Sequence, residues 1–322
     1  MDKKQQSGVI QVPQTATARP TVSRRKSYFR KHTILYAMLL PPILFAFIFS
    51  YLPMAGLVMA FQDYQPWTGF TRSEWVGLEH FKLIFTLPDT IQVTFNTLVI
   101  AVGKIAANMV VPFIFALLLN EVRHVGYKRT VQTLVYLPHF MNWVIIGGIL
   151  MDVLSPSGGL INRGMSMLGV EPVFFLGEGG WFRFTMIASD VWKEFGFSTI
   201  VYLAALAGIN PSLYEAAEAD GANRWKQTVY ITIPMLMPIM IVLGTLSLGN
   251  VLNAGFEQIL TLYSPLVYEK GDIIDTYVYR MGLVSGQYSF GTAFGLLKSI
   301  VSCLFIIAAY RLAYRYANYR VF

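Results

Sequence analysis

Residues 210–234 read NPSLYEAAEADGANRWKQTVYITIP. The Asn-Pro-Ser start suits a helix cap and a first turn, and the acids fall early in that helix, where its dipole favours negative charge. Gly221 can adopt the left-handed conformation that ends or bends a helix. The segment 209–232 is therefore predicted to be a loop that carries a short amphipathic helix, with Pro234 standing where an apolar run begins.

On both sides of this loop the chain is dominated by long apolar runs. Of its 322 residues, 55% are hydrophobic and 13% are charged, and this charged share is about half that of an ordinary soluble domain. Six runs reach the about 20 residues that a membrane-spanning helix needs. They lie at about 33–61, 95–119, 131–154, 181–208, 234–255 and 290–314. The sequence therefore predicts an all-α, polytopic membrane protein with six transmembrane helices.

A basic tail precedes the first apolar run. Residues 1–32 are polar and carry eight Lys or Arg residues against one acid, which is typical of a disordered tail. Pro41, Pro42 and Pro53 are expected to break or kink the run that follows, so that the residues before Pro41 form a short interfacial helix. The remaining residues, 33–322, are predicted to form one transmembrane domain.

The segments on the two sides of the membrane differ in their content of Lys and Arg, which indicates orientation. Sixteen of these cations lie in the two tails and in the loops at 120–130 and 209–232. The opposite segments, 62–94, 155–183 and 256–289, hold six cations and ten acids. Both termini are therefore predicted to lie in the cytoplasm, with the protein in the cell membrane.

Several ionisable residues fall inside the apolar runs, where an unpaired charge costs several kcal/mol. They are Lys104, Asp190, Lys193, Glu194 and Lys298. Asp190 and Glu194 share one helix face, and Lys193 is close enough to neutralise one of them. Two interpretations of this set, with Phe197 beside it, stay open: a charge cluster that holds helices together, or the lining of a translocation path. Lys298 has no acid within four residues, so its partner is expected on another helix of this chain or of another subunit.

The fifth run carries a second polar set. Ser247, Asn250 and Asn253 recur at every third position of an otherwise apolar helix. Polar side chains in a membrane form hydrogen bonds between helices or contact a polar solute such as a sugar. The stripe is therefore either a packing contact or a second part of the candidate path.

Motifs for catalysis, metal binding and nucleotide binding are missing from the sequence. The lone cysteine, Cys303, excludes a disulfide within the chain and a multi-thiolate metal site. No phosphate loop of the Walker type, no His-Glu-x-x-His pair and no Gly-x-Ser-x-Gly elbow occurs. The net charge of +7 is not gathered into one patch, which argues against nucleic-acid binding. We therefore expect no catalytic residue and no metal site, and the chain is not expected to be an enzyme by itself.

The loop at 209–232 resembles the signature of the permease subunits of ATP-binding-cassette (ABC) importers. That signature runs Glu-Ala-Ala, three residues, Gly and, further on, Ile-x-Leu-Pro. It is matched here by Glu215, Ala216, Ala217, Asp220, Gly221, Ala222 and Pro234. Ile233 replaces the usual Leu, and Thr228 stands where carbohydrate members commonly have Phe. By this resemblance the segment is a cytoplasmic coupling loop.

Blocks outside the loop look like the polysaccharide and oligosaccharide branch of these permeases, among them YLPHF at 136–140 and DTYVYR at 275–280. That branch is similar to the larger permease of the maltose importer. The resemblance implies a type I ABC importer permease fold and import of an oligosaccharide or polysaccharide by alternating access. The partners that it implies are a second permease in a heterodimer, a cytoplasmic ABC ATPase dimer and an extracytoplasmic solute-binding protein, beside membrane lipid.

The resemblance also implies roles for individual residues. Glu215 is expected to meet a basic group of the ATPase, the two alanines after it to allow close approach, and Gly221 to make the turn. ATP and Mg would be used by the partner ATPases, so no cofactor is expected on this chain. In the maltose importer the helix after the coupling loop helps to hold the sugar, which favours a path-lining role for Ser247 and Asn250.

Three other functions compete with sugar import. An ABC permease could carry another small polar solute, and nothing in the sequence names the solute. A transporter driven by an ion gradient would favour inverted repeats and discontinuous helices and would not need the Glu-Ala-Ala loop. A membrane enzyme would need a catalytic constellation that the sequence lacks. The ten acids against six cations of the outer segments do not favour an anionic substrate by simple complementarity, but the sign of the charge that faces the path is not given by the sequence, so uronate oligomers stay open.

Overall fold

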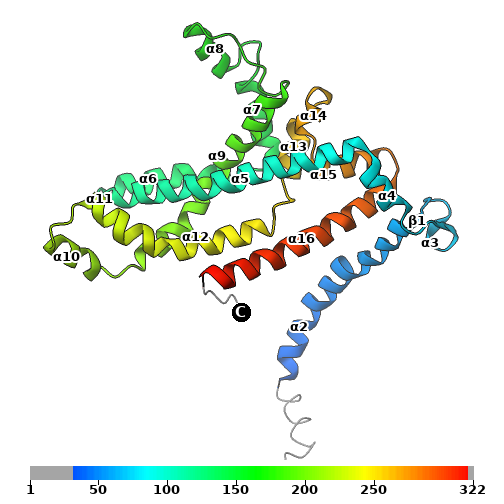
Figure 1. Ribbon diagram of the computed structural model, residues 1–322, viewed down its shortest axis with the longest axis horizontal. Helices are drawn as coiled ribbons and strands as arrows, with labels where there is room; N and C mark the ends of the chain where they lie inside the picture. The colour runs from blue at the N-terminus through cyan, green and yellow to red at the C-terminus, as the bar shows by residue number, and fades with distance from the viewer. Residues whose placement is uncertain (1–31, 318–322) are drawn as a thin grey trace, which may run out of the picture. The chain divides into compact units, whose positions relative to one another are not determined.

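The computed structural model describes residues 32–317, which are almost entirely helical (Figure 1). Of the predicted basic tail, all but His32 lies outside the described residues. Contacts within the chain separate two units, Met1–Gly56 and Leu57–Phe322.

The first unit holds the start of the first predicted span. Its described elements are α2 (Thr33–Ala46), a π-helical turn η1 (Phe47–Tyr51) and the beginning of a 3₁₀ helix, η2 (Leu52–Phe61). The predicted break at Pro41 and Pro42 is wrong, because α2 runs through both prolines. Proline is tolerated inside membrane-spanning helices. The departure from α-helical geometry follows later, on both sides of Pro53.

Four long helices form the frame of the second unit (Figure 1). They are α5 (Pro88–Glu121), α9 (Gly179–Ala207), α12 (Ile233–Leu248) and α16 (Tyr288–Ala317). α5 packs along α9, and α12 packs against both α5 and α16. This arrangement places the C-terminal end of α12 beside the middle of α5, where Gly244 lies against Met109.

Short elements connect these helices. On the side predicted to be extracytoplasmic they are β1 (Gln62–Asp63), α3 (Gly69–Arg72), β2 (Glu74–Trp75), α4 (Glu79–Thr86), α8 (Leu160–Met167), α13 (Phe256–Leu262), η5 (Pro265–Val267), α14 (Tyr268–Gly271), α15 (Ile274–Val278) and η6 (Tyr279–Val284). The others are α6 (Val125–Tyr136), η3 (Leu137–Phe140), α7 (Trp143–Val153), α10 (Ser212–Ala219), α11 (Arg224–Gln227) and η4 (Thr228–Thr232). β1 and β2 pair antiparallel, with Gln62 opposite Trp75.

The described chain contains up to six segments with the length and hydropathy of membrane spans. Four are single helical segments, Thr33–Phe61, Pro88–Glu121, Arg224–Leu248 and Tyr288–Arg311. Two are bent pairs, Val125–Phe140 with Trp143–Val153 at 104°, and Gly179–Ala207 with Ser212–Ala219 at 68°. The six segments correspond in order to the six predicted runs.

The third predicted run, 131–154, is not one straight helix. It bends after η3, which contains Pro138, and α7 begins after Asn142, whose side chain accepts a hydrogen bond of 3.0 Å from the backbone N–H three residues further on. Proline cannot continue a regular helix, and an Asn cap favours a new start. Gly196 of α9 lies against α6, where a Cβ atom would collide with the carbonyl oxygen of Val135.

The fifth predicted run, 234–255, is shifted toward the N-terminus. One continuous helical segment, Arg224–Leu248, includes the second half of the predicted loop and ends before the predicted boundary. Asn250 and Asn253 therefore lie in the turn after the helix and not on a helix face. Gly249 follows the last helical residue, and the backbone N–H of Asn253 donates 2.8 Å to the carbonyl of Asn250. Such tight turn bonds replace the α-helical pattern.

A polar layer separates two apolar cores of the second unit. One core packs α5, α9 and α13 through side chains that include Ile100, Phe182, Met186 and Ile259. Another packs α5, α9 and α12 through side chains that include Ala116, Tyr202, Leu206 and Leu236. Between them, near the middle of both α5 and α9, lie Lys104 and Asp190. The packing of the long helices therefore buries a polar site midway along the spans.

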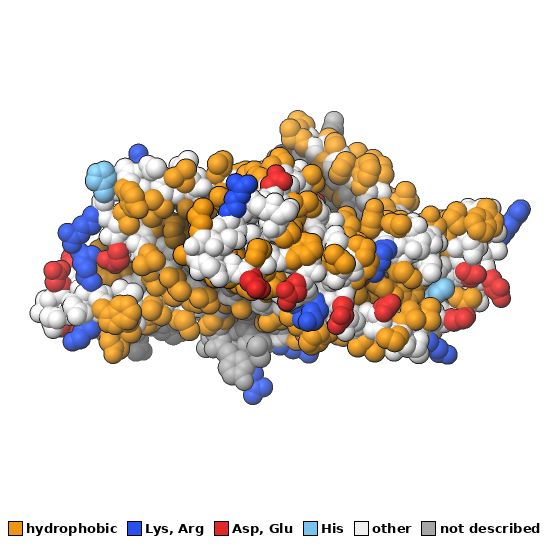
Figure 2. Space-filling model, turned by 90° about the horizontal axis from the view of Figure 1, so that it is seen from above, with side chains coloured by type: hydrophobic (Ala, Val, Ile, Leu, Met, Phe, Trp, Pro, Cys, Tyr) orange, Lys and Arg blue, Asp and Glu red, His pale blue; other side chains and the backbone are white. Residues whose placement is uncertain are grey.

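Apolar side chains cover much of the face shown in Figure 2. The exposed apolar side chains of α5 include Val102, Val110, Ile114 and Leu118. Large exposed apolar surfaces mark contact with lipid or with other subunits, as expected for a membrane subunit.

Candidate functional site

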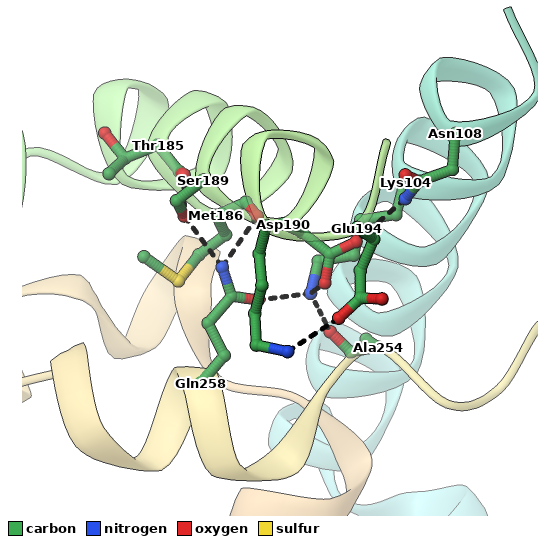
Figure 3. Close-up of polar contacts among 10 residues, drawn as sticks. Lys104, Asn108, Thr185, Met186, Ser189, Asp190, Glu194, Ala254 and Gln258 are labelled. Atoms are coloured by element: carbon green, nitrogen blue, oxygen red, sulfur yellow. Dashed lines mark hydrogen bonds and ion pairs between the residues drawn. The ribbon is translucent and has the colours of Figure 1, made fainter. Parts of the chain in front are cut away.

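Lys104 is the centre of the buried polar network (Figure 3). Its Nζ atom lies 3.1 Å from Oδ1 of Asp190 and donates 2.7 Å to the carbonyl oxygen of Ala254. It also donates a short hydrogen bond to Oε1 of Gln258. Lys104 is 6% exposed. Its three donors therefore have three acceptors, and this cation is fully engaged inside the protein.

Gln258 ties the outer helix α13 to α9. Its Nε2 atom donates 2.8 Å to the carbonyl of Met186 and 2.8 Å to Oγ of Ser189 (Figure 3). Gly255 lets the Lys104 side chain come close to the backbone before α13. The φ of Gly255 is +94°, and a Cβ atom there would lie 2.6 Å from Nζ of Lys104. The positive φ and the close approach both favour glycine.

A pocket of about 250 Å³ opens beside this network. It is lined by Ala101, Lys104, Ile105, Asn108, Asp190, Ser247, Asn250, Asn253 and Gly255. Nδ2 of Asn108 donates 2.9 Å to Oδ2 of Asp190, whereas Oδ1 of Asn108 is buried without a hydrogen-bond partner among the described residues. An unpaired buried acceptor is costly.

Lys193 and Glu194 belong to a neighbouring cluster. Nζ of Lys193 lies 2.8 Å from Oε1 of Glu194, and Nδ1 of His139 lies 2.8 Å from Oε2 of the same carboxylate. The His139 ring stacks on Phe197, with ring centroids 4.1 Å apart. Lys193 also donates 2.9 Å to the carbonyl of His139. These contacts join α9 to the bend between α6 and α7.

The structure brings together part of the predicted path set. The 250 Å³ pocket beside Lys104, which we refer to as the central pocket, is lined by four of its members: Asp190, Ser247, Asn250 and Asn253. Ser247 also lines a second hollow of about 240 Å³, together with Phe197 and others. Lys193 and Glu194 line neither hollow.

Sequence reasoning missed two members of the site, Asn108 and Gln258. Asn108 follows Lys104 by four residues, which places both on one face of α5, and this spacing was a usable signal. Gln258 had no such signal, because its partners lie 69 and more residues away.

The segment that carries the Glu-Ala-Ala signature forms a separate surface. α10 presents Glu215 and Ala216 in exposed positions, with Ala217 half-buried. Gly221 has a φ of +76°, which confirms the predicted left-handed turn. Its N–H donates 3.0 Å to the carbonyl of Glu218. Asp220 and Gly221 are exposed and Ala222 is half-buried.

Two contacts hold α10 to its surroundings. The hydroxyl groups of Tyr214 and Thr232 lie 2.9 Å apart, and Oδ1 of Asn210 accepts 3.1 Å from the backbone N–H of Ser212. Thr232 ends the π-helical turn η4 just before Pro234, whose missing N–H cannot complete a regular helical bond. The contact between the two hydroxyl groups therefore joins α10 to the end of η4, which continues directly into α12.

Ion pairs also organise the segment 256–289. Nη2 of Arg280 lies 2.6 Å from Oδ2 of Asp272, and its guanidinium lies 4.1 Å from the Tyr268 ring centroid. Burial disfavours the charged guanidinium, but the hydrogen bond and charge of Asp272 outweigh it, so the pKa of Arg280 is raised. Lys298 pairs with Asp275. Its expected partner on another helix is therefore supplied by α15 of the same chain.

Comparison with known proteins identifies the family. Residues 108–317 match the family described as binding-protein-dependent transport system inner membrane component. The chain belongs to this family. In Bacillus subtilis (strain 168), the polygalacturonan/rhamnogalacturonan transport system permease protein YteP is 44% identical to it, over 88% of each chain. Protein LplB of the same strain is 43% identical, over 88% of this chain and 89% of its own length.

Solved structures agree with these relatives. A bacterial ABC transporter involved in the import of the acidic polysaccharide alginate contains a chain that matches with a TM-score of 0.84 and 42% identity, over 91% of this chain and 99% of that one. The bacterial alginate ABC transporter in complex with alginate pentasaccharide-bound periplasmic protein matches with a TM-score of 0.82 and 41% identity, over 90% and 96% of the two chains. The predicted all-α fold of an ABC importer permease is confirmed. This family member is a multi-pass membrane permease subunit of a binding-protein-dependent transporter, as predicted.

Proposed function

We propose that this permease subunit imports an oligosaccharide or polysaccharide, with acidic sugars preferred, by alternating access. The observation that carries the proposal is the match to the alginate importer at 42% identity over 91% of the chain. The relative YteP is named for the transport of polygalacturonan and rhamnogalacturonan, and both polymers contain acidic sugars. Two relatives with substrates of one chemical class support the same class here.

The central pocket suits a sugar better than a small ion. Lys104 and Asp190 neutralise each other, so the pocket offers mainly amide and hydroxyl groups from Asn108, Ser247 and Asn250. Groups of these kinds donate and accept hydrogen bonds with sugar hydroxyls. Asp190, Asn253 and, in the adjoining hollow, Phe197 complete the proposed path. Lys193 and Glu194 support it by joining helices.

Transport is driven through α10 in this proposal. Glu215 and Ala216 are exposed, and they meet a cytoplasmic ABC ATPase dimer that uses ATP and Mg, while this chain binds no cofactor. Closure of the ATPases moves α10, and the contact between Tyr214 and Thr232 passes the movement to the spans. A second permease completes a heterodimer, a solute-binding protein delivers the sugar outside, and both termini lie in the cytoplasm.

ATP hydrolysis by the reconstituted assembly tests the proposal. The assembly contains this chain, its partner permease, the ATPase and the binding protein, and it is given neutral and acidic oligosaccharides in turn. We expect stimulation by galacturonate or alginate oligomers and little by neutral ones. Stimulation by neutral sugars alone would correct the preference for acidic sugars. No stimulation by any sugar, from an intact assembly, would reject sugar import.

A further inference from the structure

A hollow of about 580 Å³ lies on the outer side of the central pocket, in the segment predicted to be extracytoplasmic and at the start of α16. Three aromatic residues and three polar residues define its chemistry. They are Phe256, Tyr279, Tyr288, Asn253, Asp275 and Lys298. We refer to it as the outer hollow. Its volume falls in the range of about 300–1,000 Å³ that is usual for ligand sites.

The polar end of the outer hollow is a preformed cluster. Nζ of Lys298 donates 2.8 Å to Oδ1 of Asn253 and pairs with Oδ1 of Asp275. These contacts use two of the three ammonium donors and one of the two carboxylate oxygens. Lys298 is 14% exposed and Asp275 26% exposed at the side chain. A donor and an acceptor therefore remain beside each other for a ligand that carries hydroxyl groups.

The other wall of the outer hollow is aromatic. The rings of Phe256 and Tyr279 meet at 63°, with centroids 5.7 Å apart. Tyr288 also lines the hollow, and its ring meets that of Tyr64 edge-on, with centroids 6.2 Å apart. An aromatic face next to donors and acceptors suits a sugar ring, whose faces are apolar and whose edge is polar.

Asn253 connects the outer hollow to the central pocket, because it lines both. The central pocket, at about 250 Å³, is less than half as large as the outer hollow. The two spaces therefore adjoin at Asn253, whose side chain stands between them and bonds to Lys298. A neighbouring hollow of about 560 Å³ shares Lys298 with the outer hollow but is not lined by Asn253 or Asp275.

We propose that the outer hollow is a second carbohydrate subsite, which binds the units of an oligosaccharide that do not fit the central pocket. This inference rests on the proposed import of sugars. It assigns Tyr279 and Tyr288 as the stacking residues and Lys298 with Asp275 as the hydrogen-bonding pair. The subsite discriminates by chain length, since a short sugar is held in the central pocket alone.

Chain-length dependence tests the subsite. The reconstituted assembly is prepared with wild-type protein, Tyr279→Ala and Tyr288→Ala, and ATP hydrolysis is titrated with dimers and pentamers of galacturonate and of alginate. For each alanine variant we expect the concentration of pentamer that gives half-maximal stimulation to rise about tenfold. The dimer should shift by less than about twofold. A tenfold change corresponds to about 1.4 kcal/mol.

Two further variants are controls, which show whether an effect on the titration comes from a general loss of structure. Tyr279→Phe keeps the ring and should stay near wild type for both sugars. Phe184→Ala removes an exposed ring of α9 that lines neither the outer hollow nor the central pocket, and it should leave both titrations unchanged. Equal effects on dimer and pentamer, or no effect on either in a responsive wild type, would overturn the subsite alone. A wild type that no sugar stimulates would overturn the proposed function instead.

Discussion

Nζ of Lys104 lies 3.1 Å from Oδ1 of Asp190, and the two residues come from the middle of different spanning helices. Their side chains are 8% and 18% exposed. Two charges that would each be costly alone are thereby held as one neutral pair. Because Lys104 also bonds to Ala254 and Gln258, the pair joins α5, α9 and the start of α13 at one point.

Removing the cation from this pair should destabilise the protein strongly. In Lys104→Met the Asp190 carboxylate loses its ion-pair partner, and the breaking of a buried pair costs about 3–5 kcal/mol. We expect a clearly lower midpoint of thermal unfolding for the purified protein. Lys82→Met, at an exposed position of α4, is the matched control and should change stability by no more than about 0.5 kcal/mol. The double variant Lys104→Met with Asp190→Asn should recover part of the loss. A double variant no more stable than Lys104→Met would show that the pair is not the cause.

Gly255→Ala should also destabilise the network, through the backbone. The φ of +94° is unfavourable for alanine, and the new Cβ atom would lie 2.6 Å from Nζ of Lys104. We expect a loss of more than about 1 kcal/mol, measured by the same unfolding experiment. Gly148→Ala on α7, where a Cβ atom meets nothing within 4 Å, should be neutral or slightly stabilising. Similar behaviour of the two variants would remove the structural requirement assigned to Gly255.

Local chemistry made several features predictable from the sequence. The apolar runs follow from composition, because a span needs about 20 apolar residues in succession. The turn at Gly221 follows from a property of glycine itself, and its φ of +76° agrees. The Glu-Ala-Ala segment could be placed on a short exposed helix because its cap, acids and small residues are adjacent in the chain.

Other features depend on contacts between distant residues and could not be predicted. Lys104 binds Ala254 and Gln258, which lie 150 and 154 residues away, and no spacing rule reaches so far. The end of α12 at Leu248 was missed because Val251 and Leu252 keep the hydropathy high beyond the last helical turn. The prediction that Ser247, Asn250 and Asn253 form a stripe on one helix face required the helix to continue through that turn. These residues still line one pocket, because the turn bends back beside α5.

Asn250→Leu and Gln258→Leu should distinguish an amide that contacts the solute from an amide that holds helices together. Within the described part of the chain, the Asn250 side chain makes only long hydrogen bonds, of 3.5 Å to Leu246 and 3.3 Å to Asn253, so Asn250→Leu should cost little stability. It should raise the sugar concentration for half-maximal ATP hydrolysis about fivefold to tenfold, since one hydrogen bond contributes about 0.5–1.5 kcal/mol.

Gln258→Leu should show the opposite pattern. Gln258 is fully buried and has three partners, so its loss leaves buried groups unpaired and should lower the midpoint of thermal unfolding. The pocket is not lined by Gln258. Asn250→Leu with normal sugar response, or with the stability loss expected for Gln258→Leu, would return Asn250 to a packing role.

Glu215→Ala should lower both sugar-stimulated ATP hydrolysis and transport without loss of folding. The side chain is exposed on α10 and makes no contact needed for the buried cores, so stability should change by less than about 0.5 kcal/mol. If Glu215 meets a basic group of the ATPase, its removal should lower sugar-stimulated ATP hydrolysis and uptake about tenfold, as one charge-assisted hydrogen bond contributes about 1.5–3 kcal/mol. Glu171→Gln, at an exposed position of the segment between α8 and α9, serves as the control and should behave as wild type. Because the lost contact is an ion pair at the docking surface, co-purification of the ATPase with Glu215→Ala should be weaker than with wild type at low salt, and it should fall less as salt is raised. Unchanged hydrolysis and co-purification would place the coupling contact elsewhere on the chain.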